Sequence, residues 1–372
     1  MNKVFLCWTL NSGTSFYRMM NYVKYMEPEF SFAFSKWSPK FQEIADWEYR
    51  MDDPLVQKDI GFLLDECDMV IAQKFHWYGG LATIEACRTK YPNKPFMTEL
   101  DDHIFAVNSD SPAYESYFPG SEGEKIVKEQ IVNSTGLIVS TDYLRKVYEE
   151  LNPNVWVVPN GIDFDIWDNL KKPIKKSKKI RIGWAGGGSH VRDLEFIEKA
   201  VDVIRKKYMN VEFVLLGGVP PSYKDKRKIK GLYKWYPINE YPQAVSNLGF
   251  DIAIAPLRDN AFNRGKSNLR WLEYSALGIP TIASRVEPFK CIKHGETGLL
   301  ATEVDEWVDC LERLICDEQT RKWIGKAAYD EVKTNFNVEK IAKDYCKKLS
   351  LILQGKGNIS PEAALMIATR NN

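Results

Sequence analysis

Short apolar runs alternate along most of this chain with stretches that have the 3.6-residue period of amphipathic helices. The runs are rich in Val, Ile and Leu, and they cover residues 3–8, 69–73, 94–100, 136–140, 155–159, 179–185, 211–217, 251–257 and 280–284. Strands of a parallel sheet have this composition, because helices cover both faces of such a sheet. The alternation therefore predicts βα units on parallel sheets and an α/β fold class.

The length of the chain, 372 residues, favours two domains over one, because a single hydrophobic core rarely organises so many residues. The basic, proline-containing segment 169–179 falls between two series of predicted strands and has the composition of a linker. We therefore expect two Rossmann-like, doubly wound domains facing a central cleft. The predicted divisions are a first domain over 1–168, a linker over 169–179, a second domain over 180–353 that ends in a helix at about 338–353, and a C-terminal segment over 354–372, with a short helix, that packs back on the first domain.

The composition argues against several classes of protein. No apolar run approaches the roughly 18 residues that a membrane span needs, so any membrane association is expected to be peripheral. The N-terminal run has no small-residue cleavage site and is predicted to be a first strand rather than a signal peptide. Seven cysteines without a CxxC pair favour reduced thiols in a cytoplasmic protein. The four histidines lack metal-binding spacings, so no metal is expected.

The near-neutral net charge of +1 conceals two oppositely charged halves. Residues 1–170 carry 15 Lys and Arg against 26 Asp and Glu, a net charge of −11. Residues 171–372 carry 36 against 24, a net charge of +12. Most of these charges are expected on solvated faces, but the basic half suits an anionic ligand. The acidic half disfavours nucleic acid as a partner without excluding it, because the basic half can still contribute.

A glycine-rich turn follows the predicted strand 179–185 and leads into a helix. Gly187 and Gly188 allow an anion to approach the backbone, and Ser189 and His190 stand where the next helix begins. The turn therefore predicts phosphate binding. A nicotinamide-binding fingerprint is the competing interpretation, but glycines at 217 and 218 occupy the place of its ribose-binding acid.

A second polar loop follows the predicted strand 251–257. Its Gly-Lys-Ser sequence is similar to the end of a P-loop, but Asn260 stands where that motif needs glycine. The next helix is predicted to begin near Asn268, so that Lys266, Ser267 and Asn268 can meet an anion. Glu273, one and a half turns into this helix, can accept hydrogen bonds from two hydroxyl groups. The alternative is a solvated loop lysine and a partly exposed helix glutamate.

Taken together, the motifs of residues 155–300 resemble the nucleotide-sugar domain of GT-B glycosyltransferases, in particular glycosyltransferase family 4 (group 1). The resemblance rests on VWVVPNGIDFDIW at 155–167, the glycine-rich turn, DIAIAPL at 251–257, LEYSALGIPTIAS at 272–284 and GETGLL at 295–300. It implies that Glu273 binds the ribose of the donor and that Lys266 binds its diphosphate. It also implies a GT-B fold and no metal cofactor, since the leaving diphosphate is stabilised by basic side chains and a helix terminus.

One position departs from the family pattern. The family has two glutamates eight positions apart, and the second matches Glu273, but Gly265 stands where the first is expected. In the family the first glutamate lies toward the donor sugar. The resemblance therefore covers the nucleotide end of the site better than the sugar end.

The first half resembles the family less closely. Gly13 lies in a segment similar to the loop that approaches the donor after the first strand, and Arg18 follows as a substrate-binding or helix-capping residue. Asp101 and Asp102 follow the predicted strand 94–100, near the place where the family often has a functional histidine. Either carboxylate can accept a proton or bind acceptor hydroxyls, or it can cap a helix or form a turn. His103 and Tyr114 are further candidates for acceptor binding.

These observations predict a cytoplasmic, metal-independent glycosyltransferase that takes a nucleoside-diphosphate sugar as donor. The resemblance implies retention of anomeric configuration and a carbohydrate or glycoconjugate acceptor, as in surface polysaccharide biosynthesis. Two alternatives stay open: glycosylation of modified DNA or of a protein, and a nucleotide-sugar-binding protein whose catalysis has degraded. The missing first glutamate favours the last alternative.

Overall fold

The computed structural model describes residues 1–7, 13–26, 29–34, 65–74, 81, 84, 85, 88–171, 178–223, 227–232, 234 and 236–360. The chain forms two compact units, of which the first comprises Met1–Ser109, Ala113–Asn160 and Val338–Asn372, and the second Asp110–Pro112 and Gly161–Asn337. Trp8, Asn11, Ser12, most of the predicted linker and the predicted helix near the C-terminus lie outside the described residues.

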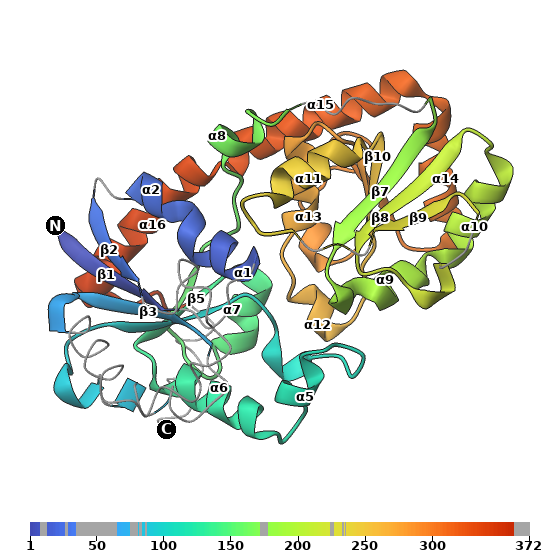
Figure 1. Ribbon diagram of the computed structural model, residues 1–372. Coiled ribbons are helices and arrows are strands. Elements are labelled where there is room, and N and C mark those ends of the chain that lie inside the picture. The colour runs from blue at the N-terminus through green and yellow to red at the C-terminus, as the bar shows by residue number, and fades with distance from the viewer. Residues whose placement is uncertain are drawn as a thin grey trace. The chain divides into compact units, whose positions relative to one another are not determined.

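The first unit is built on a parallel sheet of six described strands in the order β2-β1-β3-β4-β5-β6 (Figure 1). The strands are β1 (Asn2–Cys7), β2 (Phe30–Phe34), β3 (Met69–Gln73), β4 (Phe96–Leu100), β5 (Gly136–Val139) and β6 (Val155–Val157). Every residue of β3, β4 and β5 is buried, which confirms the expectation of strands covered on both faces.

Two helices of the first unit, α6 and α7, begin where a polar side chain caps them. Ser121 accepts a hydrogen bond from the backbone N–H of Glu124 at the start of α6, and Thr141 accepts one from Leu144 at the start of α7. The described helices are α1 (Gly13–Ser15), the π-helical turn η1 (Phe16–Met20), α2 (Asn21–Met26), the 3₁₀ turn η3 (Ile104–Ala106), α5 (Tyr114–Tyr117), α6 (Glu122–Asn133), α7 (Asp142–Tyr148) and α16 (Val338–Leu353).

Helix α16 differs in placement from the sequence-based division, which assigned residues 338–353 to the second domain. Its buried side chains recur every three or four residues and pack into the core of the first unit. Tyr345 contacts Tyr22 of α2 edge to face, with ring centroids 5.7 Å apart. The apolar face of α16 therefore packs in the first unit, although the helix comes after the second unit in the sequence (Figure 1).

The second unit has its own parallel sheet of six described strands, in the order β12-β11-β10-β7-β8-β9 (Figure 1). The strands are β7 (Ile180–Gly186), β8 (Val211–Gly217), β9 (Ile229–Leu232), β10 (Ile252–Ala255), β11 (Thr281–Ser284) and β12 (Leu299–Ala301). Its described helices are α8 (Phe164–Trp167), η4 (Gly188–His190), α9 (Val191–Phe196), α10 (Glu198–Lys207), η5 (Pro221–Tyr223), α11 (Tyr241–Leu248), α12 (Ala261–Arg264), α13 (Leu269–Ala276), η6 (Glu287–Phe289), α14 (Val304–Cys316) and α15 (Glu318–Asn335).

The strand order reverses once in each sheet. In the second unit β7 lies between β8 and β10, and in the first unit β1 lies between β2 and β3. Loops that leave the carboxyl ends of two strands at such a reversal diverge to opposite faces, and ligands of open α/β sheets bind in the crevice this creates. A ligand-binding site is therefore expected at the loops after β7 and β10 in the second unit and at those after β1 and β3 in the first unit.

Candidate functional site

The glycine-rich turn lies at the carboxyl end of β7, as predicted. A side chain at Gly188 would meet no atom within 4 Å, and one at Gly187 would meet only the Ser189 Oγ at 4.0 Å. These two positions therefore leave open space beside the backbone. The turn itself is held by Gly218, whose N–H donates to the carbonyl of Gly186 over 2.9 Å.

Glycine at 217 has a structural cause. Its φ of +94° lies in the left-handed region, and a Cβ there would lie 2.2 Å from the carbonyl oxygen of Gly186. An acidic side chain at this position would collide with the turn. The competing nicotinamide interpretation, which needs such an acid, therefore has no support in this geometry.

Asp193, in the first turn of α9, joins the glycine-rich turn to the loop after β10. Its side chain is 2% exposed. One carboxylate oxygen lies 3.0 Å from the Nδ1 of His190, and the other accepts hydrogen bonds from the backbone N–H of Arg258 and the Nδ2 of Asn263, each at 3.0 Å. No local pattern marks Asp193, because its partners after β10 lie 65 and 70 residues away in the sequence.

The charges of His190 and Asp193 follow from these contacts. Burial would raise the pKa of Asp193, but the hydrogen bonds from His190 and Arg258 outweigh it and lower this pKa. Burial and the positive charge of Arg270 lower the pKa of His190 to about 4. At neutral pH the imidazole is neutral and must donate its Nδ1–H to the ionised Asp193, which leaves Nε2 as an acceptor.

The loop after β10 forms α12 and then leads into α13, so that the predicted helix start near Asn268 is confirmed. Lys266 lies in this loop with its Nζ 4.3 Å from the centroid of the Phe262 ring. Ser267 is half-buried, and Asn268 donates its Nδ2–H to the Cys291 sulfur over 3.3 Å. All three predicted residues therefore gather between α12 and α13.

Glu273 is buried inside the second unit rather than exposed on a helix surface, with 5% of its area accessible. Tyr241 of α11 donates its hydroxyl hydrogen to Oε2 of Glu273 over 3.2 Å. Burial and the Glu273 carboxylate hold the pKa of Tyr241 well above its usual range, so that the phenol remains a donor. The next residue, Tyr274, accepts the backbone N–H of Ala185 over 2.8 Å and so fastens α13 to β7.

In the first unit Arg18 lies inside a buried polar network. Its Nε donates to Oε1 of Glu99 over 2.6 Å, and both side chains are 1% exposed. Its Nη1 donates to the carbonyl of Val158 over 2.7 Å and to Oδ1 of Asn160 over 2.9 Å. Arg18 therefore ties η1 to β4 and to the loop after β6, and it does not lie on an accessible surface.

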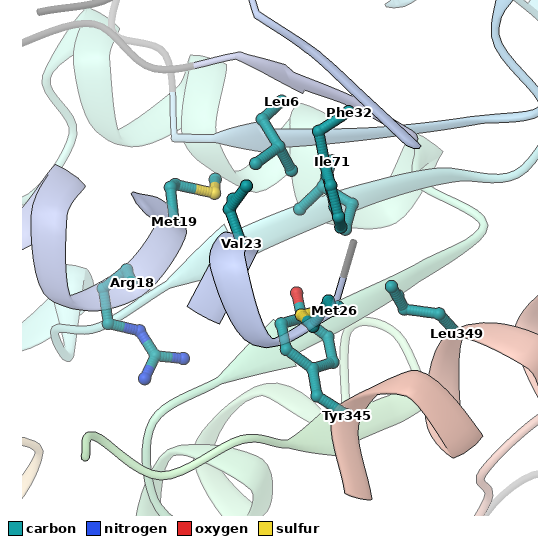
Figure 2. A pocket seen from close by; sticks show the side chains of 9 residues that line it. All are labelled: Leu6, Arg18, Met19, Val23, Met26, Phe32, Ile71, Tyr345 and Leu349. Carbon is teal, nitrogen blue, oxygen red and sulfur yellow. The ribbon is translucent and has the colours of Figure 1, made fainter. Parts of the chain in front are cut away.

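A small cavity beside Arg18 is lined mainly by apolar side chains (Figure 2). Its lining residues are Leu6, Arg18, Met19, Val23, Met26, Phe32, Ile71, Tyr345 and Leu349. Its volume is about 10 Å³, which is about the least that can hold one water molecule. This cavity is too small for a sugar or a nucleotide.

The predicted carboxylates lie at the carboxyl end of β4. Asp101 forms a salt bridge with Lys74, whose Nζ lies 3.5 Å from Oδ1 and which follows β3 directly. Burial would lower the pKa of Lys74, but the charges of Asp101 and Asp102 outweigh it and raise this pKa. Lys74 is thus a charged partner that the sequence analysis missed, although its position directly after a strand was a usable signal.

The remaining predictions of the first unit are placed nearby. The backbone carbonyl of Asp102 accepts the hydroxyl of Tyr148 over 2.5 Å, and the ring of His103 lies 6.2 Å from that of Tyr143. Tyr114 is half-buried in α5, with its ring 6.1 Å from that of the exposed Phe118. Gly13 begins α1, and a side chain there would meet nothing within 4 Å. Their predicted roles stay predictions.

Two absences hold for the part of the chain that the structure describes. It contains no group of three or more His, Cys, Asp or Glu side chains placed to hold a metal ion. It also contains no helix that is both long enough and apolar enough to cross a membrane.

Comparison with known proteins agrees with the resemblance found in the sequence. Residues 179–317 match the family model described as "Glycosyl transferases group 1". A D-inositol 3-phosphate glycosyltransferase of Corynebacterium glutamicum (strain R) is 25% identical over 262 residues, which are 62% of this chain and 61% of that protein. The chain spans between 44% and 61% of the length of the curated relatives it matches.

Solved structures match the fold over nearly the whole chain. Anabaena Alr3699/HepE in complex with UDP has a TM-score of 0.64 at 14% identity, over 94% of this chain and 100% of that one. A glycosyltransferase from Rickettsia africae ESF-5 has a TM-score of 0.65 at 14% identity, over 95% and 98%. The expectation of a GT-B fold is confirmed, and residues 179–317 are similar to the group 1 glycosyltransferase family model.

Proposed function

We propose that this protein is a glycosyltransferase that moves a sugar from a nucleoside-diphosphate sugar to an acceptor hydroxyl. One observation carries the proposal. At the strand reversal of the second unit, an open glycine turn follows β7, and the cationic Lys266 lies in the loop after β10. Glu273 is buried on α13, which Tyr274 fastens to β7, and all of these residues fall in the part of the chain that matches the group 1 glycosyltransferase model. Phosphates suit the first two features, and ribose hydroxyls suit the third.

A retaining transfer without a metal ion is the second part of the proposal. The diphosphate leaves with negative charge, and fixed donors in the second unit would stabilise that charge as it develops. Lys266 supplies one such donor. In the first unit Asp101, held in place by Lys74, is the proposed contact to the acceptor hydroxyl. The proposed acceptor is a carbohydrate or glycoconjugate, and surface polysaccharide synthesis is the proposed context.

A uridine nucleotide is the donor to test first, because solved neighbours of the same fold bind UDP and UDP-glucose. The purified protein is incubated with UDP-, GDP- and dTDP-sugars and a panel of saccharide acceptors. We expect acceptor-dependent release of nucleoside diphosphate, and NMR of the product's anomeric proton tests retention. A product with inverted anomeric configuration would contradict the proposed retention but not the proposed sugar transfer.

Replacing the ribose contact tests the donor site. Glu273→Ala removes a carboxylate that accepts two hydroxyl hydrogen bonds, so we expect nucleotide affinity to fall by roughly a hundredfold. Glu296→Ala, at an exposed position of the same unit, is the control and should bind like the original protein. Unchanged affinity in Glu273→Ala would show that the ribose assignment is wrong.

A binding protein without turnover is the second candidate, and Gly265 favours it, because the family's first glutamate is missing there. The same panel separates the two functions. Tight nucleotide-sugar binding without transfer to any acceptor and without hydrolysis would support the binding protein and contradict the enzyme.

A further inference from the structure

Arg270 is a residue of the second unit that neither the motifs nor the family pattern singled out. It lies on α13, three positions before Glu273, so the two side chains leave the helix on the same side. Its guanidinium carbon lies 4.8 Å from the centroid of the Trp184 ring. Trp184 is fully buried in β7, so the guanidinium lies over a ring that is itself held in the core.

The position of Gly186 shows how closely the guanidinium approaches the glycine-rich turn. A Cβ at Gly186 would lie 2.6 Å from Nη1 of Arg270 and 2.7 Å from Nη2. The guanidinium therefore occupies the space that a side chain at this position would fill. Only glycine at 186 lets Arg270 lie directly against the start of the turn, next to the open positions at 187 and 188.

Arg270 holds a buried donor without an acceptor. Within the described residues its Nη1 is buried and has no hydrogen-bond partner. The two other arginines of this loop and helix have carboxylate partners, since Arg258 pairs with Asp110 at 2.8 Å and Arg264 with Asp259 at 2.7 Å. Proteins rarely leave a buried guanidinium N–H unsatisfied, so an acceptor from outside the chain is expected here.

The positive charges around Arg270 favour an anion as the hydrogen-bond acceptor of its Nη1–H. Arg270 and Lys266 both lower the pKa of His190, which places two positive charges near the same imidazole. The planar fork of a guanidinium matches the oxygens of a phosphate group. The neighbouring turn offers room for such a group, and Glu273 lies one turn of helix farther along.

We propose that Arg270 binds a phosphoryl oxygen of the donor's nucleoside diphosphate through Nη1–H, beside the turn at Gly186–Ser189. Arg270 then contributes a second positive charge, besides Lys266, against the leaving diphosphate, and Trp184 and Gly186 hold it in place. The inference rests on the proposed function, because it names a further residue of the same donor site.

The test compares UDP with uridine, which lacks phosphate, by calorimetry and NMR titration on the full chain. Arg270→Met keeps a long side chain over Trp184 but removes the donor. We expect UDP affinity to fall by roughly tenfold to a hundredfold while uridine affinity is unchanged. The melting temperature without ligand should stay the same or rise, because an unsatisfied buried donor has been removed. Arg264→Met, which removes an arginine already paired with Asp259, is the control and should bind UDP normally.

Each outcome separates the inference from the proposed function. UDP binding that is unchanged in Arg270→Met overturns the inference and leaves the function standing. If Arg270→Met loses affinity for UDP and for uridine equally and also melts at a lower temperature, the inference is overturned and Arg270 has a structural role. If Arg270→Met does not fold, Arg270→Lys decides, with UDP affinity expected to fall several-fold because the planar fork is lost. Failure of the original protein to bind UDP, GDP or dTDP overturns the proposed function and the inference with it.

Discussion

Asp193 is the residue that holds two separate loops of the second unit in one arrangement. It accepts hydrogen bonds from His190 in its own segment and from Arg258 and Asn263 after β10. Loss of any one of these donors would leave the buried carboxylate less well satisfied and would destabilise the arrangement. The positions of Lys266 and the glycine-rich turn relative to each other therefore depend on a residue that touches neither the proposed ribose nor the proposed sugar.

At the same scale, His190 makes the stability of the chain depend on pH. Its pKa is about 4 in the folded protein against an ordinary value of 6.5, so the unfolded state binds the proton more tightly. The free energy of unfolding should therefore fall as the pH drops from about 6.5 to about 4, by about 2–3 kcal/mol from this group. Above pH 6.5 its contribution is constant.

His190→Asn tests this dependence, because its side-chain N–H can still donate to Asp193 but the group cannot be protonated. Denaturant unfolding between pH 4 and 7 should show a flatter curve for His190→Asn than for the original protein. Parallel curves for the original protein and His190→Asn would contradict the assignment.

Among the elements of the second unit, the glycine that ends β8 and a glycine of the turn after β7 have different tasks. Gly217 is required by the fold, because its φ is +94° and a Cβ would strike the Gly186 carbonyl. Gly188 faces open space, so the fold itself does not require glycine there. Substitution of Gly217 should therefore affect the stability of the turn, whereas substitution of Gly188 should affect only ligand binding to it.

Paired alanine variants exploit this difference. Gly217→Ala should lower the melting temperature by several degrees, since strain of about 1–3 kcal/mol is expected from φ alone and the clash adds to it. Gly188→Ala should melt like the original protein but bind UDP more weakly, because its methyl group enters the proposed phosphate site. Full UDP affinity in Gly188→Ala would place the diphosphate elsewhere.

The strands that the sequence did not predict share one property. β2, β9 and β12 each form an edge of a sheet. β12 is buried but only three residues long, which is too short for a distinct apolar run, and β9 is only partly buried along its length. Its apolar signal is therefore weak, whereas β3, β4 and β10, which are buried on both faces, stood out in the sequence.

At the scale of the whole molecule, the chain returns to its first unit after completing the second. Leu349 of α16 is fully buried in the first core, together with Tyr345 and Met26. Stability of the first unit thus depends on residues more than 300 positions from its first strand. The sequence-based division, which assumed that α16 closes the second domain, could not detect this.

Leu349→Ala should therefore destabilise the first unit, by about 2–5 kcal/mol for a fully buried leucine. Hydrogen exchange followed by mass spectrometry should show faster exchange in β1 and β3, and unchanged exchange in β7 and β8. Lys347→Ala, on the exposed side of the same helix, should behave like the original protein. Faster exchange in the second sheet instead would contradict the placement of α16.

For the complete reaction, we expect that sugar transfer does not require a metal ion. If Lys266 and Arg270 stabilise the leaving diphosphate, transfer should continue at the same rate in excess EDTA. The measurement is release of nucleoside diphosphate with and without chelator. Loss of activity that Mg²⁺ or Mn²⁺ restores would show that the expectation of no metal is wrong.

The parallel α/β class, the GT-B resemblance and the functional candidates Lys266 and Glu273 could all be predicted from the order of the amino acids. These follow from local patterns, since buried strands, glycine turns and motif spacing are written in neighbouring residues. Other features of the site became visible only in the folded chain. The partners of Asp193, Tyr241 and Arg270 lie on other helices, strands and loops. Likewise, the buried ion pair joins Arg18 to Glu99, 81 positions later in the sequence. Such contacts depend on how strands are ordered in a sheet, and no local pattern encodes that order.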